Sequence, residues 1–401
     1  PYSVLSYLEK QPINADWTPN AGYPVYTGGM PTQALNNGAV QHVDRTDYSP
    51  FVTAEHNFSL ADMMLKADVG MRWVRTQEEI AGLAAPLLSL GLEPGDVTAY
   101  AFNNGPATWT TRSFSYSYFL PSLDLNLMVT PDLKVRFDAS RTETAPNNAQ
   151  LIPNTSYGGR VGSLTANGNN PDLLPYLSDN FDLGAEWYYA ANDYVSVDAF
   201  YKHVTQFPVS SITTITVPGV QATSTLDPNY GHLAQFTDST VTNGLAANVT
   251  GVEVGWQQML MWGFGYQVNG TYAHTSANFN NYLLVGNQFS LPGIGNSANF
   301  VAFYQRHGLQ ARVTVQWQAD ELTGAQQEQN GGIYAPEPVY LKGSTEVDFS
   351  TQYDLNSHLS VYFEALNLTD AVYDLYGRFS NQTLDLVDYG RSYTAGVRAK
   401  F

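Results

Sequence analysis

The sequence predicts an all-β fold, an antiparallel up-and-down β-barrel that spans a membrane. Three observations predict it: segments in which apolar and polar residues alternate, tight turns that alternate with long connections, and aromatic residues at the ends of the apolar rows. Alternation with a period of two gives a strand one apolar and one polar face. In a membrane barrel the apolar face meets lipid and the polar face lines the interior.

The last strand shows the alternation most clearly. Residues 390–401 read GRSYTAGVRAKF, with small or polar residues between the apolar ones. The apolar positions are Tyr393, Ala395, Val397, Ala399 and Phe401. A chain that ends on the aromatic residue of its final strand is typical of bacterial outer-membrane barrels, because that strand must present a lipid face and close the sheet.

The same alternation recurs upstream in five hairpins and in two earlier strands. The predicted hairpins pair 122–130 with 133–141, 181–189 with 194–203, 251–260 with 264–276, 299–305 with 309–318, and 345–353 with 359–367. The earlier strands are 44–58 and 63–75, and residues 76–112 are expected to be irregular. With the last strand the total is about thirteen, and strands of roughly nine to eleven residues can cross a bilayer at a tilt.

The connections between strands distinguish a barrel from a soluble sandwich. Long connections over 142–180, 205–248, 277–298, 319–343 and 368–389 alternate with the tight turns. Outer-membrane barrels show this asymmetry as short periplasmic turns and long extracellular loops, and a Greek-key sandwich has no reason to keep it. Aromatic residues at both ends of the apolar rows fit two interfacial girdles. They are Trp73, Phe181, Tyr201, Tyr272, Trp317 and Tyr393 toward the long connections, and Tyr189, Tyr353 and Phe401 toward the tight turns.

Composition supports the membrane barrel and excludes other classes. Charged residues make up 13% of the 401 residues, about half of the roughly 25% usual in soluble domains. No apolar run reaches the roughly 18 residues of a membrane-spanning helix, so a spanning chain must form a closed barrel. The net charge of −18 argues against nucleic acid as a partner. The absence of cysteine fits an oxidising route.

The domain organisation follows from the first residues and from the strand count. Residues 1–43 are rich in Pro, Gly and Asn without periodicity, and we expect a loop-rich amino-terminal remnant there. The chain starts at Pro1 without Met or a signal peptide, so an upstream part is expected to be missing. Bacterial single-chain barrels have even strand numbers. We therefore interpret residues 44–401 as the carboxy-terminal part of a larger barrel.

Several stretches resemble the TonB-dependent outer-membrane receptors, especially the subgroup common in Caulobacter-like and sphingomonad-like bacteria. LPSLDLNLMVTPDLKVRFDASRT from Leu120 looks like the family's mid-barrel hairpin. NNPDLLPYLSDNFDLGAEWYY from Asn169, followed by VDAFYKHV from Val197, is similar to its next hairpin. NLTDAVY from Asn367 and YGRSYTAGVRAKF from Tyr389 look like its closing strands. The order and spacing of these pieces are more specific than each piece alone.

The resemblance implies a complete barrel of 22 strands, of which these would be the last, in the bacterial outer membrane. It also implies an amino-terminal plug domain and a short box contacted by the TonB energy-coupling complex, neither of which is present in this sequence. The implied function is energy-coupled uptake of a scarce, bulky ligand such as siderophore-bound iron, cobalamin or an oligosaccharide. Outer-membrane lipid and lipopolysaccharide are the further partners that it implies.

Candidate ligand-binding residues fall into two groups. Charged side chains that the alternation turns toward the lumen are Asp124, Arg136, Asp138, Asp182, Glu186, Glu253, Arg312, Glu346, Asp348 and Glu364. Aromatic side chains of the long connections, suited to stacking on a sugar or contacting a siderophore, are Tyr334, Tyr340, Tyr373 and Tyr376, with Tyr230, Phe236 and Phe379 beside them. The alternative is structural: the charges form a hydrated, mutually paired wall, as in any large barrel, and the aromatic residues pack on each other.

The sequence shows no sign of a catalytic or metal centre. The histidines have no HExxH or paired spacing, and neither GxSxG nor a glycine-rich phosphate loop is present. We therefore expect no enzyme, no metal and no cofactor. The alternatives to an energy-coupled receptor are a passive porin of the same architecture, a membrane-embedded enzyme, and a soluble β-rich carbohydrate-binding protein. Recovery in buffer without detergent would favour the last.

Overall fold

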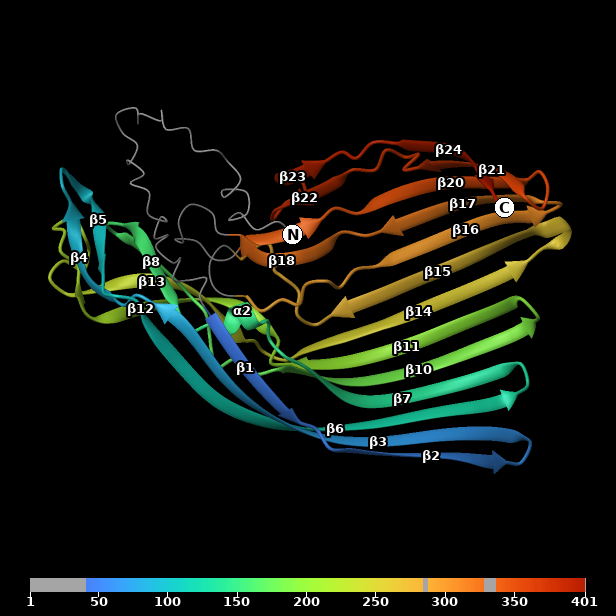
Figure 1. Ribbon diagram of the computed structural model, residues 1–401, viewed down its shortest axis with the longest axis horizontal. Helices are drawn as coiled ribbons and strands as arrows, with labels where there is room; N and C mark the ends of the chain where they lie inside the picture. Colours follow the sequence, from blue (N-terminus) through green and yellow to red (C-terminus); the bar gives the residue numbers. More distant parts are fainter. Residues whose placement is uncertain (1–40, 284–287, 328–336, 401) are drawn as a thin grey trace, which may run out of the picture.

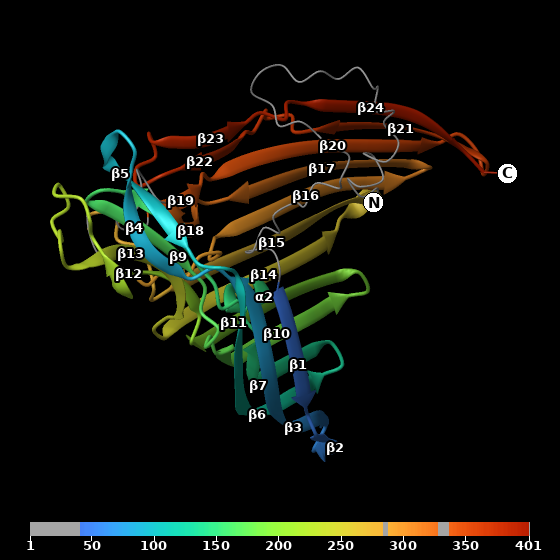
Figure 2. The same cartoon turned by 60° about the vertical axis from the view of Figure 1, so that its left-hand side comes forward.

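The computed structural model describes residues 41–283, 288–327 and 337–400, and strands dominate them (Figure 1). The helical elements in these residues are α2 (Asn148–Leu151) and the single 3₁₀ turn η2 (Met261–Gly263). No helix within the described ranges is long and apolar enough to cross a membrane. The strands form one large curved sheet and two smaller sheets at one of its ends (Figures 1 and 2).

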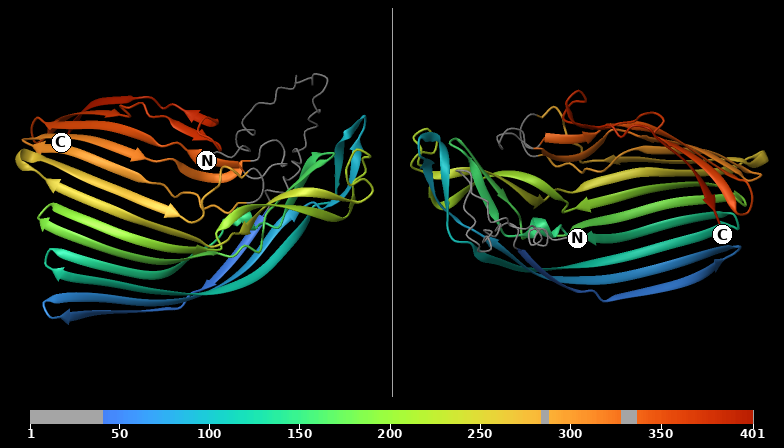
Figure 3. Two further views of the ribbon diagram at one scale, coloured as in Figure 1. Left: turned by 180° about the vertical axis from the view of Figure 1, so that it is seen from behind. Right: turned by 45° about the horizontal axis from the view of Figure 1, so that its top comes forward.

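The large sheet is a single-layer wall whose strands follow one another antiparallel. Its 14 strands run in the order β1-β3-β6-β7-β10-β11-β14-β15-β16-β17-β20-β21-β24, with β2 beside β3. They are β1 (Gln41–Tyr48), β2 (Phe51–Leu60), β3 (Met63–Ala84), β6 (Thr108–Thr130), β7 (Leu133–Thr144), β10 (Tyr176–Ala190), β11 (Asp193–Thr205), β14 (Ala247–Met259), β15 (Phe264–Thr275), β16 (Ser297–Arg306), β17 (Leu309–Gln318), β20 (Ser344–Asp354), β21 (Leu359–Leu366) and β24 (Ser392–Ala399). The sheet curves like part of a barrel, as Figure 3 shows from behind and above. Among the described strands, β24 pairs only with β21, and β1 and β2 pair only with β3, so both edges carry unpaired backbone groups.

The predicted hairpins and the antiparallel barrel-type sheet are confirmed, with one difference in the first strand. The predicted strand 44–58 is divided into β1 and β2, which pair with successive halves of β3. Pro50 lies between them and has no N–H to donate to the ladder. Its carbonyl oxygen instead accepts a hydrogen bond of 3.1 Å from the backbone N–H of Trp73.

The prediction that residues 76–112 are irregular is wrong. β3 continues to Ala84 and β6 begins at Thr108, and the two strands stay in register along their full paired length. With 22 and 23 residues they span roughly 70 Å, more than twice the roughly 30 Å hydrocarbon thickness of a bilayer. The outer halves of these strands lie beyond any lipid, so neither face needs to be apolar and the alternation fades while the pairing continues.

Three of the long connections fold together into a second sheet, which we call the cap. Its strands, in the order β12-β13-β9-β8-β5-β4, are β4 (Leu87–Glu93), β5 (Asp96–Asn104), β8 (Thr155–Arg160), β9 (Ser163–Gly168), β12 (Pro208–Gln221) and β13 (Leu233–Asn243). Most pairs are antiparallel, but β13 and β9 are parallel. The edge strands β4 and β12 contact each other, so the sheet wraps around its own apolar core. That core includes Leu90, Tyr100, Leu164 and Phe236.

Two further connections form a small sheet beside the carboxy-terminal half of the wall (Figure 1). Its strands, in the order β18-β19-β22-β23, are β18 (Glu321–Gln327), β19 (Glu337–Leu341), β22 (Tyr373–Tyr376) and β23 (Thr383–Val387). The long connections are therefore mostly sheet, because each supplies strands that pair with strands of another connection. Sequence periodicity within one connection does not report such pairing.

The two faces of the wall differ as the alternation predicts. Apolar residues of adjacent strands lie opposite each other, as in the row Leu125, Phe137 and Leu183. Many are exposed on the wall, including Met71, Trp73, Phe119, Phe181, Leu183, Trp187, Val197, Val254, Trp256, Tyr272, Phe300, Trp317, Val361, Tyr393 and Val397. The alternating positions are mainly polar or charged. The structure thus shows an apolar face with aromatic ends, which suits contact with lipid, while Phe401 lies outside the described residues.

Candidate functional site

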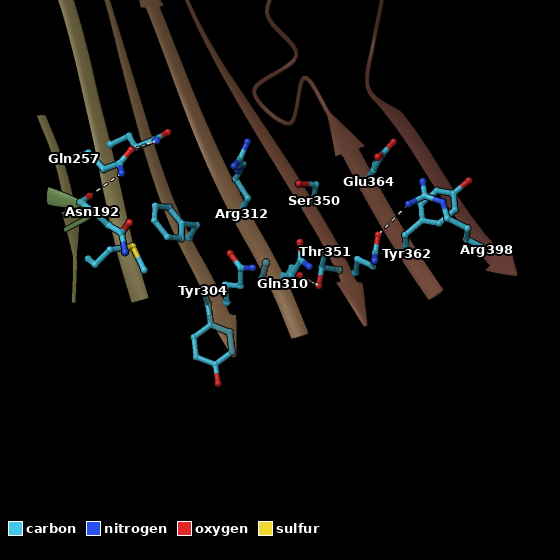
Figure 4. Close-up of a pocket in the computed structure, with 16 residues that line it drawn as sticks. Asn192, Gln257, Tyr304, Gln310, Arg312, Ser350, Thr351, Tyr362, Glu364 and Arg398 are labelled. Carbon is cyan, nitrogen blue, oxygen red and sulfur yellow. Dashed lines mark hydrogen bonds between the residues drawn. The ribbon is translucent and has the colours of Figure 1, made fainter. Parts of the chain in front are cut away.

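The polar face of the wall contains a pocket toward the tight-turn end of β14 to β24 (Figure 4). Its volume is about 620 Å³ and its lining is rich in amides and hydroxyls. Among the predicted residues it contains Arg312 and Glu364, and it adds Tyr362 and Arg398 from β21 and β24. The Arg398 guanidinium lies 5.8 Å from the Tyr362 ring centre and donates a hydrogen bond of 3.4 Å to the side-chain amide oxygen Oε1 of Gln352.

Two glycines on this face of the wall lie opposite aromatic residues of the adjacent strand, and their lack of a side chain leaves space for the rings. Phe303 on β16 lies opposite Gly265 on β15, and Tyr362 on β21 lies opposite Gly396 on β24. A Cβ added at either glycine would overlap the aromatic ring beside it. The missing side chain lets each ring lie against the neighbouring strand, so that the ring contributes to the wall without closing the pocket.

The amino-terminal half of the wall holds the other predicted charges in two arrangements. Arg136 and Glu186 form an ion pair of 2.7 Å between β7 and β10. Asp182 belongs to a lateral row of carboxylates in which each residue lies opposite the next on the adjacent strand. The row is Glu55, Asp68, Asp124, Asp138 and Asp182. Lys66 contacts its first two members, at 3.1 Å and 3.5 Å.

The remaining predicted wall residues do not join these groups. Glu253 on β14 lies opposite Asp198 of β11 and Thr271 of β15. Asp348 on β20 accepts a hydrogen bond of 2.9 Å from the backbone N–H of Asn367 and so fixes the end of β21. Glu346 lies opposite Gln316 of β17. The wall charges thus fall into separate groups rather than one binding centre.

The small sheet brings two of the predicted tyrosines together. Tyr340 and Tyr376 stack with their ring centres 5.2 Å apart and their planes 16° from parallel. Tyr340 donates to the Asn281 side chain over 2.9 Å, and Tyr376 donates to the Asp320 carboxylate over 2.7 Å. Burial raises the pKa of both phenols, so they remain hydrogen-bond donors at neutral pH.

The other aromatic residues predicted for the loops differ in accessibility. Tyr373 is half-exposed on β22, and Tyr230 and Phe379 are exposed. Phe236 is completely buried in the core of the cap, so its prediction as a ligand contact is wrong. Tyr376 is only 6% exposed and Tyr340 is partly buried, so Tyr340 is the more accessible ring of the stacked pair. Tyr334 lies outside the described residues.

A polar cluster on the wall strands β1, β3, β6 and β7, near their long-connection ends, was not predicted, and we call it the mouth cluster. It consists of Arg45, Glu78, Tyr116 and Glu143. The Arg45 guanidinium lies 2.5 Å from the Glu78 carboxylate, whose side chain is 1% exposed. The Tyr116 hydroxyl donates to the same carboxylate over 3.3 Å. Burial, followed by the negative charge of Asp47, raises the pKa of the Glu143 carboxyl, and Arg45 opposes the shift.

The sequence carries a signal for this cluster that the alternation rule for lipid-facing strands misreads. Residues 113–118 read SFSYSY, a strict alternation of serine with aromatic residues. Phe114, Tyr116 and Tyr118 form a row along one face of β6, with ring centres 5.7 Å and 5.6 Å apart and successive ring planes tilted by 43°. Here the aromatic face is the one that continues the polar face of the wall, because the strand has left the lipid.

The groups described so far offer hydrogen-bonding, charged and aromatic side chains. In the part of the chain that the structure describes, no three or more His, Asp or Glu side chains are placed to bind a metal ion. What the geometry offers is a polar path past the wall pocket and, at the opposite end, aromatic and charged side chains at the mouth cluster and the small sheet.

Comparison with known families decides how this architecture is classified. The family described as TonB dependent receptor-like, beta-barrel matches residues 6–368. The chain belongs to this family. No curated protein sequence matches the TonB-dependent receptor barrel described here.

Solved structures with a similar fold are receptors and transporters. The ferric enterobactin receptor PfeA of Pseudomonas aeruginosa, in complex with enterobactin, aligns with a TM-score of 0.55 and 16% identity over 90% of this chain and 55% of its own. The siderophore receptor PirA of Acinetobacter baumannii aligns with a TM-score of 0.54 and 15% identity over 90% and 55%. The FrpB iron transporter of Neisseria meningitidis aligns with a TM-score of 0.55 and 12% identity over 90% and 46%. This TonB-dependent receptor barrel thus spans about half the length of the structures that it resembles.

Proposed function

We propose that this chain is the carboxy-terminal part of the barrel of an outer-membrane receptor for energy-coupled uptake of a scarce, bulky ligand. The family match over residues 6–368 carries the proposal. The curved wall supports it, because its apolar, aromatic-ended face suits lipid and its other face is polar. In this proposal the barrel part extends to residue 401 and includes β1 from Gln41, slightly before the predicted start at residue 44. The predicted loop-rich stretch before it lies outside the described residues. The likeness to the Caulobacter and sphingomonad subgroup remains a prediction.

Siderophore-bound iron is the ligand class that we propose first, with cobalamin and oligosaccharides as the other candidates. The solved structures of similar fold are named as siderophore receptors and an iron transporter. Their low identity supports the fold, so the choice of ligand is ours. The chain itself is proposed to be non-catalytic.

We assign the proposed contacts by their position between the long-connection end and the tight-turn end of the wall. The mouth cluster and the small-sheet tyrosines Tyr340, Tyr373 and Tyr376 would meet the ligand first. Tyr334 lies outside the described residues and stays a predicted contact. The lower wall residues would face the plug domain and the passing ligand: Arg136, Asp182, Glu186, Glu253, Arg312, Glu346, Asp348 and Glu364. Lipid and lipopolysaccharide would cover the apolar face, and TonB would act through the full-length protein.

An uptake experiment separates this proposal from a passive porin. Cells that lack the gene are complemented with the full-length protein and supplied with labelled ferric siderophores, cobalamin or oligosaccharides in turn. We expect gene-dependent uptake of one class that stops when TonB is deleted or the proton gradient is dissipated. Gene-dependent uptake that continues without TonB would identify a passive channel instead and contradict the proposal.

A further inference from the structure

One of the tight turns at the end of the wall is apolar, unlike its neighbours. The six tight turns in the described part of the chain join β2 to β3, β6 to β7, β10 to β11, β14 to β15, β16 to β17 and β20 to β21. Five of them carry Asp, Asn, Ser or His at the tip, at Asp62, Asp132, Asn192, His307 and 356–358. The β14–β15 turn instead reads Met-Trp-Gly between Leu260 and Phe264.

The side chains of this turn point away from the protein. Met261 is 73% exposed and Trp262 is 69% exposed, and Leu260 and Phe264 beside them are about half-exposed. An exposed cluster of this kind marks a surface that meets another apolar phase. The fold itself does not use these side chains, because they pack against little of the chain.

The backbone conformation of the turn is unfavourable for a side chain as large as tryptophan. Trp262 has φ 65°, in the left-handed region where glycine and asparagine are favoured and a bulky residue is strained. The other end of the same turn, Gly263, also has a positive φ. Ala61 and His307 also have a positive φ in their tight turns, but Trp262 is the bulky apolar side chain among them and it is largely exposed. An apolar environment outside the chain would stabilise such a side chain.

The apolar turn continues an aromatic belt on the outward face of the wall. Trp256 packs edge-on against Tyr266 at 5.0 Å between ring centres, and its indole N–H donates to the Tyr189 hydroxyl over 3.0 Å. Phe264 lies 4.8 Å from Tyr304 on the next strand. Such amphipathic rings occupy the boundary between hydrocarbon and headgroups. The turn begins where this belt ends.

We propose that the Leu260–Phe264 turn is inserted into the bilayer, so that Met261 and Trp262 extend the lipid contact of β14 and β15 past the ends of the strands. The occupant of this surface is the lipid leaflet on the tight-turn side, because the turn is continuous with the belt that faces lipid. The wall is then embedded more deeply at β14–β15 than at the polar turns on either side. This inference rests on the membrane placement in the proposed function.

The chain has no cysteine, so a single introduced cysteine can be labelled alone. We would place a nitroxide at Met261→Cys in the full-length protein in nanodiscs of phosphatidylethanolamine and phosphatidylglycerol. Val254→Cys, on the outward face of β14, reports whether the wall is in lipid. Asp132→Cys, in the β6–β7 turn, is the matched polar turn. At each position, the rate at which the nitroxide collides with oxygen is compared with the rate at which it collides with a water-soluble nickel complex.

We expect oxygen to dominate at 254 and 261 and the nickel complex to dominate at 132. Lipid-like collisions at 254 with water-like collisions at 261 would overturn the insertion and leave the proposed function intact. Water-like collisions at 254 would overturn the membrane placement itself. A second variant adds Trp262→Gly, which favours the observed backbone, to Met261→Cys. We expect its label to move toward water, and an unchanged label would show that Trp262 does not hold the turn in the bilayer.

Discussion

The ion pair between Arg45 and Glu78 is the most deeply buried charge contact of the mouth cluster. Removing one partner of a buried pair costs about 3–5 kcal/mol, because the other charge is left without compensation. Arg45 keeps 25% of its side chain exposed, so we expect Glu78→Ala to lower the free energy of unfolding by about 3 kcal/mol, at the lower end of that range. Urea unfolding in lipid vesicles measures this. Glu79→Ala, at an exposed position of the same strand, is the control and should change little.

The raised pKa of Glu143 predicts how the mouth cluster responds to pH. A carboxyl whose pKa is higher in the folded state binds more protons when folded. The free energy of unfolding therefore falls as pH rises from the ordinary glutamate pKa of 4.5 through the raised pKa. Glu143→Gln removes the ionisable group. We therefore expect this variant to be more stable than wild type at pH 7 and to lose part of the pH dependence. Urea midpoints measured from pH 4 to pH 8, roughly the range in which a raised carboxyl titrates, test this. An unchanged slope would contradict it.

Within an element, two glycines of β15 lie on opposite faces of the wall. Gly265 is closely packed on the polar face, and Gly270 has open space around it on the lipid face. A Cβ at Gly265 would overlap the Phe303 ring and lie 3.0 Å from the Gln258 carbonyl oxygen, whereas a Cβ at Gly270 meets nothing nearer than 3.7 Å. Overpacking costs about 1–3 kcal/mol. We expect Gly265→Ala to lose stability within that range and to turn the ring into the pocket. Gly270→Ala, on the same strand, should be neutral, and equal losses would contradict the assignment of the two faces.

Between elements, Arg378 ties the β15–β16 connection to the small sheet. Its side chain is 8% exposed, lies 5.5 Å over the Phe279 ring, and donates to the carbonyl oxygens of Asn281, over 3.0 Å, and Leu283. Lysine cannot reproduce this planar set of contacts. We expect Arg378→Lys to speed amide hydrogen exchange in residues 276–283, by an amount that corresponds to about 1–3 kcal/mol of lost charge-assisted hydrogen bonding. Arg391→Lys, a half-exposed position with an ion pair of 3.4 Å to Asp370, is the control. Unchanged exchange in the Arg378 variant would show that other contacts hold the connection.

For the whole molecule, the strands that can be predicted from the sequence are those in which contact with lipid restricts which residues occur. Strands such as 133–141 and 309–318 were predicted because each residue must choose between lipid and the polar interior. Beyond the lipid this constraint ends, and the pairing of β9 with β13 or of β19 with β22 depends on contacts between distant connections. The same limit applies to the site. Arg312 and Glu364 were predicted for the wall, but neither the Tyr340–Tyr376 stack nor the burial of Glu78 follows from any local pattern.

The cap and the wall differ in what holds them together, and this predicts that they can unfold separately. The cap has its own apolar core with Phe236 completely buried, whereas the wall is a single layer. Phe236→Ala should cost about 3–5 kcal/mol, a large part of the stability of a unit this small. We expect protease added to intact cells to cut within residues 206–246 while the wall keeps its heat-modifiable migration on gels, because its strands share no side chain with that core. Tyr230→Ala, at a position that is 54% exposed in the same connection, should remain resistant. If the wall unfolds together with the cap in the Phe236 variant, the two form one cooperative unit, and the cap then cannot rearrange around a ligand without disturbing the barrel strands.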